Sequence, residues 1–133
     1  MAVSPTIAAR VFAVLLALSG ALTGLLGVRT LVDPEGMMTS FGVALGTLDD
    51  VKLLVAVLGS VIVSLAGFTL AAAAWSWQRR DAGRNLGLLA ALSLLFVAAC
   101  AYGLGGSAQV LVLDGVRGGV LLVSGIVWRL AES

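Results

Sequence analysis

Asp114 and Arg117 carry opposite charges inside an otherwise apolar stretch near the end of the chain. Side chains three residues apart lie on one face of a helix, so the carboxylate and the guanidinium can form an ion pair. A charge deep in a bilayer costs at least about 2.5 to 3.5 kcal/mol on insertion scales, so it needs a partner and often marks a site. In a site, Asp114 would accept hydrogen bonds and Arg117 would bind an anion or a carbonyl oxygen.

Two interpretations of this pair are open at the level of sequence. The functional one is a polar pocket in the outer half of a membrane protein, with Asp114 and Arg117 inside it. Four more charged residues would lie near the mouth of that pocket: Arg29, Asp49, Asp50 and Lys52. The structural one is that Asp114 and Arg117 satisfy each other and fix the last helix against its neighbours.

The composition argues against several kinds of chemistry. The chain has no histidine and a single cysteine, Cys100, whereas most metal and haem sites depend on imidazole or thiolate ligands. We therefore predict neither a metal site nor a cofactor. The formal net charge is only +1, and no run of Lys and Arg could neutralise a row of phosphates. We expect no nucleic-acid partner.

The elements that position these residues are predicted to be membrane-spanning helices. Of the 133 residues, 60% are hydrophobic and only 11% are charged, which is too apolar for a soluble domain. Four barrel strands could not close, and open sheet edges are intolerable in lipid. We predict an all-α fold, an integral membrane antiparallel four-helix bundle that forms a single domain over residues 1–133 in a lipid bilayer. The predicted spans are residues 11–28, 53–77, 86–104 and 107–130.

The long link between the first two spans is predicted to contain a short helix. Asp33 is a good N-cap, and Pro34 suits the first helical position. The apolar residues that follow, between Met37 and Leu45, would give this helix one lipid-facing side. We expect it to lie at the membrane interface or over the mouth of the bundle. The links at 78–85 and 105–106 are short and can join only neighbouring helices.

The distribution of Lys and Arg predicts the orientation in the membrane. The link between the second and third spans carries Arg79, Arg80 and Arg84, whereas the first link has four acids beside its two bases. By the positive-inside rule the arginine-rich link is cytoplasmic. This predicts a multi-pass protein of the inner membrane with both termini in the cytoplasm. The three tryptophans would then share the cytoplasmic interface, where indoles are favoured: Trp75, Trp77 and Trp128.

Small residues recur at a spacing of four, the pattern that lets membrane helices approach closely. The pairs are Gly20 with Gly24, Ser60 with Ser64, Gly83 with Gly87, and Gly115 with Gly119. Packing within the bundle explains this pattern, and a seam between two copies is the alternative. A homo-oligomer or a larger membrane complex therefore stays an open expectation.

Four short motifs give the chain a resemblance to a known family. They are Leu31-Val-Asp33-Pro34 after the first span, Leu48-Asp-Asp-Val-Lys52 at the start of the second, Gly59 within it, and Asp114-Gly115 at the start of the last. Together they look like the small DoxX-like four-helix bacterial membrane proteins and their uncharacterised relatives. The resemblance implies a fold and a topology, and it implies a link to quinone or other lipophilic small molecules.

These observations favour a non-enzymatic membrane protein, either an accessory subunit or a binding protein for a lipophilic small molecule. Two alternatives from other classes stay open. One is a membrane enzyme or quinone-linked subunit that uses Asp114 and Arg117 as an acid–base or electrostatic pair. The other is a small transporter or channel, which would need a water-lined path to the cytoplasmic side.

Overall fold

The computed structural model describes residues 3–36, 49–103, 108 and 111–133, without the side chains of 49–54 and 101. These residues form α1 (Pro5–Val32), α3 (Asp49–Trp77), α4 (Asp81–Gly103), a π-helical segment η1 (Leu111–Gly115) and α6 (Val116–Glu132). No strand occurs in these described ranges. The all-α prediction is confirmed.

The described helices provide four stretches that are long and apolar enough to cross a membrane, the last of which joins η1 and α6. They are Pro5–Val32, Val55–Trp77, Asp81–Cys100 and Leu111–Glu132. At 1.5 Å per residue even the shortest of them reaches the roughly 30 Å of a hydrocarbon core. The chain is therefore a multi-pass membrane protein by length and composition, and its helices belong in a lipid bilayer.

The first three helices are longer than the apolar runs that predicted them. α1 begins six residues before Val11, the predicted start, and it includes Arg10. The helix tolerates this charge because the Arg10 guanidinium lies over the ring of Trp77, 5.0 Å from its centroid. At its other end α1 continues past Arg29 to Val32, because a cation is favoured in the last turn of a helix.

The turn between α3 and α4 is shorter than the predicted link of residues 78–85. It closes by two backbone bonds, from Arg80 N–H to the Trp75 carbonyl and from Arg79 N–H to the Ser76 carbonyl, both 2.9 Å. Arg79 has a φ of 60°. These are the marks of a Schellman motif, in which the left-handed position is usually glycine. Helix α4 then starts at Asp81, an acid in its first turn.

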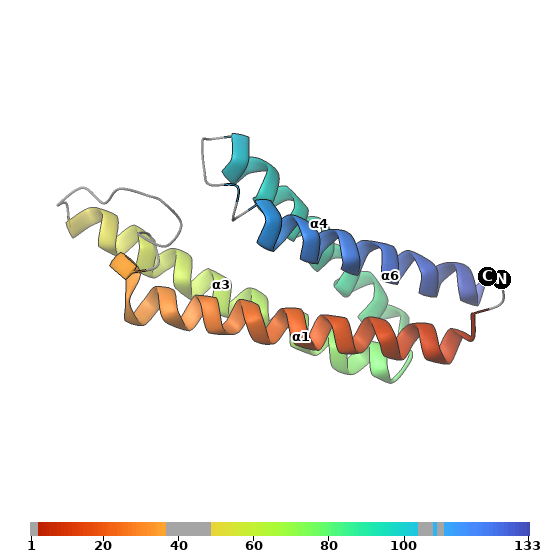
Figure 1. Cartoon of the computed structure of the whole chain (residues 1–133). Helices are drawn as coiled ribbons and strands as arrows, with labels where there is room; N and C mark the ends of the chain where they lie inside the picture. Colours follow the sequence, from red (N-terminus) through yellow and green to blue (C-terminus); the bar gives the residue numbers. More distant parts are fainter. Residues whose placement is uncertain (1–2, 37–48, 104–107, 109–110) are drawn as a thin grey trace.

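Each helix packs against two others. α1 contacts α3 and α6, and α4 contacts α3 and α6. In Figure 1 the α4–α6 pair lies close to the α1–α3 pair at the end where α1 begins and α6 ends, and the pairs diverge toward the other end. Residues 34–36 are helical, and Gly36 N–H donates to Oδ1 of Asp33 at 3.0 Å. The rest of the predicted interfacial helix lies outside the described residues.

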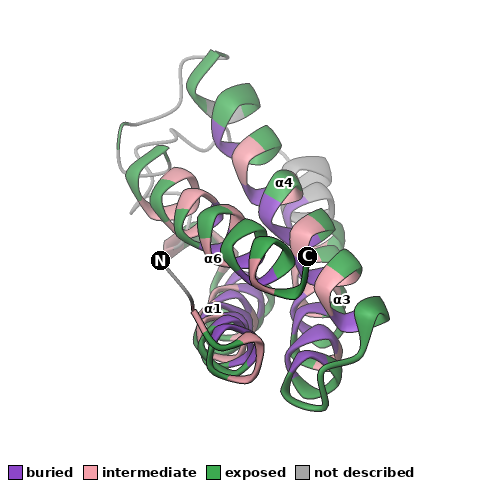
Figure 2. Ribbon diagram, turned by 90° about the vertical axis from the view of Figure 1, so that its right-hand side faces the viewer, coloured by how far each residue is buried: buried purple, intermediate pink, exposed green. Residues whose placement is uncertain are grey.

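The buried core lies toward the end that holds the termini. Figure 2 shows the buried residues facing one another between the helices. The largest fully buried side chains include Phe12, Leu16, Leu121 and Trp128. Trp128, which was predicted to share the cytoplasmic interface with Trp75 and Trp77, is buried inside the bundle and does not face head groups. Its ring is 0% exposed and packs on Phe12, with 5.7 Å between the ring centroids.

Glycines let the helices approach, but not all at the predicted pairs. On α1, Gly20 and Gly27 face α3, where an added Cβ would lie 3.0 Å or less from Leu70 and Val63. On α6 the close approaches are at Gly118, where an added Cβ would lie 2.9 Å from the carbonyl oxygen of Ala91, and at Gly125, where it would lie 2.5 Å from Leu88. An added Cβ at Gly119 would meet nothing within 4 Å. The seam of α6 therefore runs one residue away from the predicted pair of Gly115 and Gly119.

This offset predicts opposite effects for two adjacent glycines. Gly118→Ala should destabilise the protein by about 1 to 3 kcal/mol, because backbone atoms of α4 must move to admit the methyl group. Gly119→Ala should be neutral or stabilise by up to about 1 kcal/mol through helix propensity. Unfolding by SDS in mixed micelles, followed by circular dichroism, measures both. Equal effects of the two substitutions would contradict the packing of α6 on α4.

Candidate functional site

Arg117 is the centre of a polar cluster between α6 and α1. Its Nε donates to the carbonyl of Leu113 at 3.2 Å, and its Nη2 donates to Oδ1 of Asp114 at 2.6 Å. Its Nη1 faces α1 and donates to Thr23 Oγ1 at 2.7 Å, to the Ser19 carbonyl at 3.1 Å and to Ser19 Oγ at 3.3 Å. All three guanidinium nitrogens are thus bound by the protein itself.

The ion pair between Asp114 and Arg117 is mostly shielded from the surroundings. The Asp114 side chain is 16% exposed and that of Arg117 is 14% exposed. Asp114 belongs to η1, a π-helical segment that runs directly into α6. π-Helical segments are rare in proteins, and those that occur are often at functional sites. The pair predicted from a spacing of three residues is therefore present, and it has partners on α1 that the spacing could not indicate.

The depth of the cluster follows from its contact with α1. Helix α1 has 28 residues, so it is about 42 Å long. Ser19 lies at its midpoint, about 20 Å from either end. If α1 is centred in the bilayer, the Arg117 guanidinium lies near the midplane, where an unpaired charge is most costly.

The other predicted site residues are not gathered around Arg117. Arg29 is exposed and lies two turns beyond Thr23 on α1, on a different face of the helix. Asp49, Asp50 and Lys52 form the first turn of α3, and their side chains lie outside the described residues. Their place in a pocket with Asp114 and Arg117 stays a prediction.

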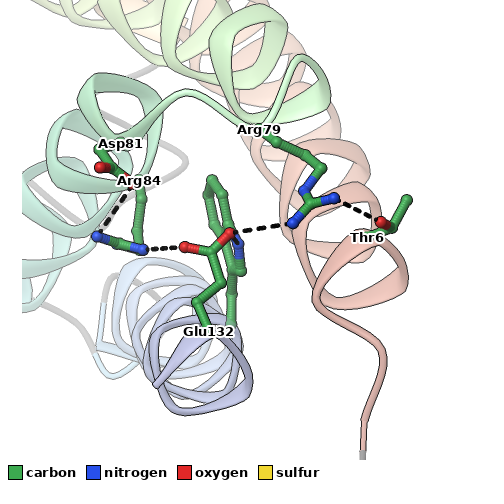
Figure 3. Close-up of polar contacts among 6 residues, drawn as sticks. Thr6, Arg79, Asp81, Arg84 and Glu132 are labelled. Carbon is green, nitrogen blue, oxygen red and sulfur yellow. Dashed lines mark hydrogen bonds and ion pairs between the residues drawn. The ribbon is translucent and has the colours of Figure 1, made fainter.

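A second polar cluster, not predicted from the sequence, lies at the end that holds the termini. Figure 3 shows Glu132 between two arginines. Its carboxylate pairs with Arg84 at 2.7 Å and with Arg79 at 3.7 Å, and it accepts a hydrogen bond from Trp128 Nε1 at 2.8 Å. Arg79 also donates to Thr6 Oγ1 at 2.9 Å. This cluster ties the start of α1, the α3–α4 turn and the end of α6 together.

Comparison of the chain with protein-family models, with curated proteins and with solved structures finds no match. The resemblance to DoxX-like proteins thus stays a prediction based on the four short motifs.

Two apolar grooves border α1. The larger has a volume of about 510 Å³ and lies between α1 and α6. Its aliphatic walls include Ile7, Val11 and Leu15 on α1 and Gly119, Val123 and Val127 on α6. The smaller, of about 290 Å³, lies between α1 and α3. Both are open to the surroundings of the bundle.

Along each helix, the larger groove includes residues that are near neighbours of the Arg117 cluster. Leu15 lies one helical turn before Ser19, and Gly119 lies two residues after Arg117. An elongated apolar molecule in the groove would therefore have its inner end near the deepest polar group of the protein.

Ser19 and Thr23 could have been suspected from the sequence, because hydroxyls four apart on an apolar span share one face and commonly hydrogen-bond across helices.

Proposed function

We propose that this protein binds a lipophilic small molecule, without catalysing a reaction, in the groove between α1 and α6. The observation that carries the proposal is the position of this groove, which is lined mostly by aliphatic side chains and whose last α1 residue, Leu15, lies one turn before Ser19, an acceptor of Arg117. A molecule with an apolar chain and a carbonyl head group, such as a quinone, matches that order of apolar and polar groups.

The proposal includes an antiparallel four-helix bundle in the inner membrane with both termini in the cytoplasm. The contacts of Arg79 with Thr6 and of Arg84 with Glu132 support it, because they bring the α3–α4 turn to the two chain ends. The arginines of that turn favour the cytoplasmic side. A DoxX-like identity fits this arrangement and is part of the proposal.

An accessory subunit is the second candidate function. It is favoured by the contacts of Arg117, whose three nitrogens all bind protein acceptors, as expected of a structural ion pair. In that case Asp114 and Arg117 hold α6 on α1, and the exposed helix faces bind another membrane protein. The quinone-linked enzyme and the transporter stay alternative predictions.

Two glycine substitutions test the binding proposal. Gly119 lines the groove with open space around it, so Gly119→Leu should fill the groove and leave the fold intact. Gly67 on α3 is exposed and has the same open space outside the groove, so Gly67→Leu is the matched control. Native mass spectrometry of protein released gently from its membranes, with identification of the bound small molecule, measures retention.

We expect Gly119→Leu to lower retention of the bound lipophile at least roughly tenfold, because even one methylene changes binding in an apolar pocket by such factors. Gly67→Leu should retain it. A wild-type protein that carries no small molecule, or carries one that Gly119→Leu does not remove, would overturn the binding proposal. Either result would leave the accessory subunit as the better account.

A further inference from the structure

The smaller groove is built from one face of α1 and one face of α3. Its α1 wall includes Ala13, Val14 and Ala17, and its α3 wall includes Leu70, Ala74 and Trp77. Ala17 lies three and four residues after Val14 and Ala13, and the α3 residues are spaced by four and three, so each set lies on one side of its helix. Leu70 forms the far end of the α3 wall, and Trp77, the last residue of α3, forms the other.

Arg10 continues the α1 wall at the end marked by Trp77. It precedes Ala13 by three residues and Val14 by four, so it lies on the same face of α1. Its guanidinium lies over the Trp77 ring at 5.0 Å, a contact that holds the charge at the mouth of the groove. Within the described residues the guanidinium has no hydrogen-bonded carboxylate, and Arg10 is exposed. In the described part of the chain, its N–H groups are therefore open to an anion.

With α1 centred in the bilayer, the mouth of the groove lies at the level expected for lipid head groups. Arg10 is nine residues from Ser19, the midpoint of α1, which corresponds to about 14 Å along the helix. Half of a typical hydrocarbon core is about 15 Å. Trp77, which is half exposed, is the residue type that prefers this interface.

The charge around the mouth is complementary to an anion. The Arg79 guanidinium binds Thr6, which lies one helical turn before Arg10 on the same face of α1. Arg80 is exposed in the adjoining turn. Two carboxylates at this end are engaged by arginines: Glu132 by Arg79 and Arg84, and the exposed Asp81 by Arg84 at 3.3 Å. A positive cluster next to the membrane attracts anionic lipid.

We propose that the groove between α1 and α3 is a binding site for one anionic phospholipid. An acyl chain lies along Ala74, Ala17 and Leu70, and the phosphate is bound by Arg10 beside Trp77. This site is separate from the groove between α1 and α6, so it stands or falls independently of the proposed function.

Native mass spectrometry of the purified protein with added dioleoyl phosphatidylglycerol tests the proposal. Dioleoyl phosphatidylcholine, which has the same acyl chains and no net charge, is the control lipid. We expect the wild-type protein to bind phosphatidylglycerol in preference to phosphatidylcholine. Arg10→Gln should lower its occupancy about fivefold, the factor that corresponds to one arginine near a membrane surface. Ala74→Leu should lower it too, because the leucine side chain occupies the path of the acyl chain.

Arg129→Gln is the matched control. Arg129 is an exposed arginine in the last turn of α6, so its loss changes the net charge equally without touching the groove. This variant should bind as wild type does, and circular dichroism should show unchanged helix in all three variants. Equal binding of both lipids, equal losses from Arg10→Gln and Arg129→Gln, or full binding by Ala74→Leu would each overturn the site. A dimer of the chain that excludes lipid would do the same.

Discussion

Replacing Arg117 by leucine will destabilise the protein by about 3 to 5 kcal/mol, because it leaves a shielded carboxylate without its partner. Asp114 would lose the hydrogen bond at 2.6 Å that now neutralises it. The hydroxyl groups of Ser19 and Thr23 would lose their donor, and α6 would lose its polar contact with the middle of α1. Lysine would not restore the cluster, since one ammonium cannot replace three guanidinium nitrogens.

Unfolding by SDS in mixed micelles, followed by circular dichroism, measures this loss. The double substitution Arg117→Leu with Asp114→Leu should recover a large part of the stability, since removing both charges is far less costly than removing one. Arg129→Leu is the control on the same helix, because Arg129 is exposed. An effect of Arg117→Leu no larger than that of Arg129→Leu would show that the ion pair does not hold α6 on α1.

Trp128→Ala will have an effect of similar size, about 3 to 5 kcal/mol, as expected when a large buried aromatic side chain is removed. The Trp128 ring is 0% exposed, packs on Phe12 and lies under the Arg84 guanidinium at 5.4 Å. Its indole N–H also donates to Glu132. Trp128→Phe should lose less stability than Trp128→Ala. It keeps an aromatic ring on Phe12, although it gives up the hydrogen bond to Glu132.

The control for this prediction is Trp75→Ala, since Trp75 is 38% exposed at the same end of the bundle. It should cost clearly less than Trp128→Ala in the same SDS titration. If the two alanine substitutions were equally destabilising, the assignment of Trp128 to the core would be wrong.

The sequence predicted the class of fold because the apolar runs are long and few residues are charged. It misplaced the helix ends for one physical reason. In the sequence, charged residues suggest the limits of membrane helices, but arginines lie inside helices where an aromatic ring or a helix terminus stabilises them. Arg10 lies over Trp77, and Arg29 lies in the last turn of α1. The positions of these partners depend on how the helices pack, which the sequence does not state.

The candidate site was predicted in part. The pairing of Asp114 with Arg117 is a local property of one helix, so a spacing of three residues was enough to predict it. The link to Ser19 depends on the rotation of α6 against α1, and one sequence does not contain that angle. The same reason explains why Gly118, and not Gly119, lies close to α4, since these neighbours point to different sides of the helix.

The contact between Phe12 and Trp128 also has a consequence for biosynthesis. The two rings belong to opposite ends of the chain, and they meet in the same core. During synthesis, Phe12 enters the membrane long before Trp128 leaves the ribosome, because the chain grows from the N-terminus. Until then the surface of α1 that Trp128 covers must face lipid or another protein. The core can close only after the last helix has been inserted, so a nascent chain that stops before α6 exposes an unfilled core to cellular quality control.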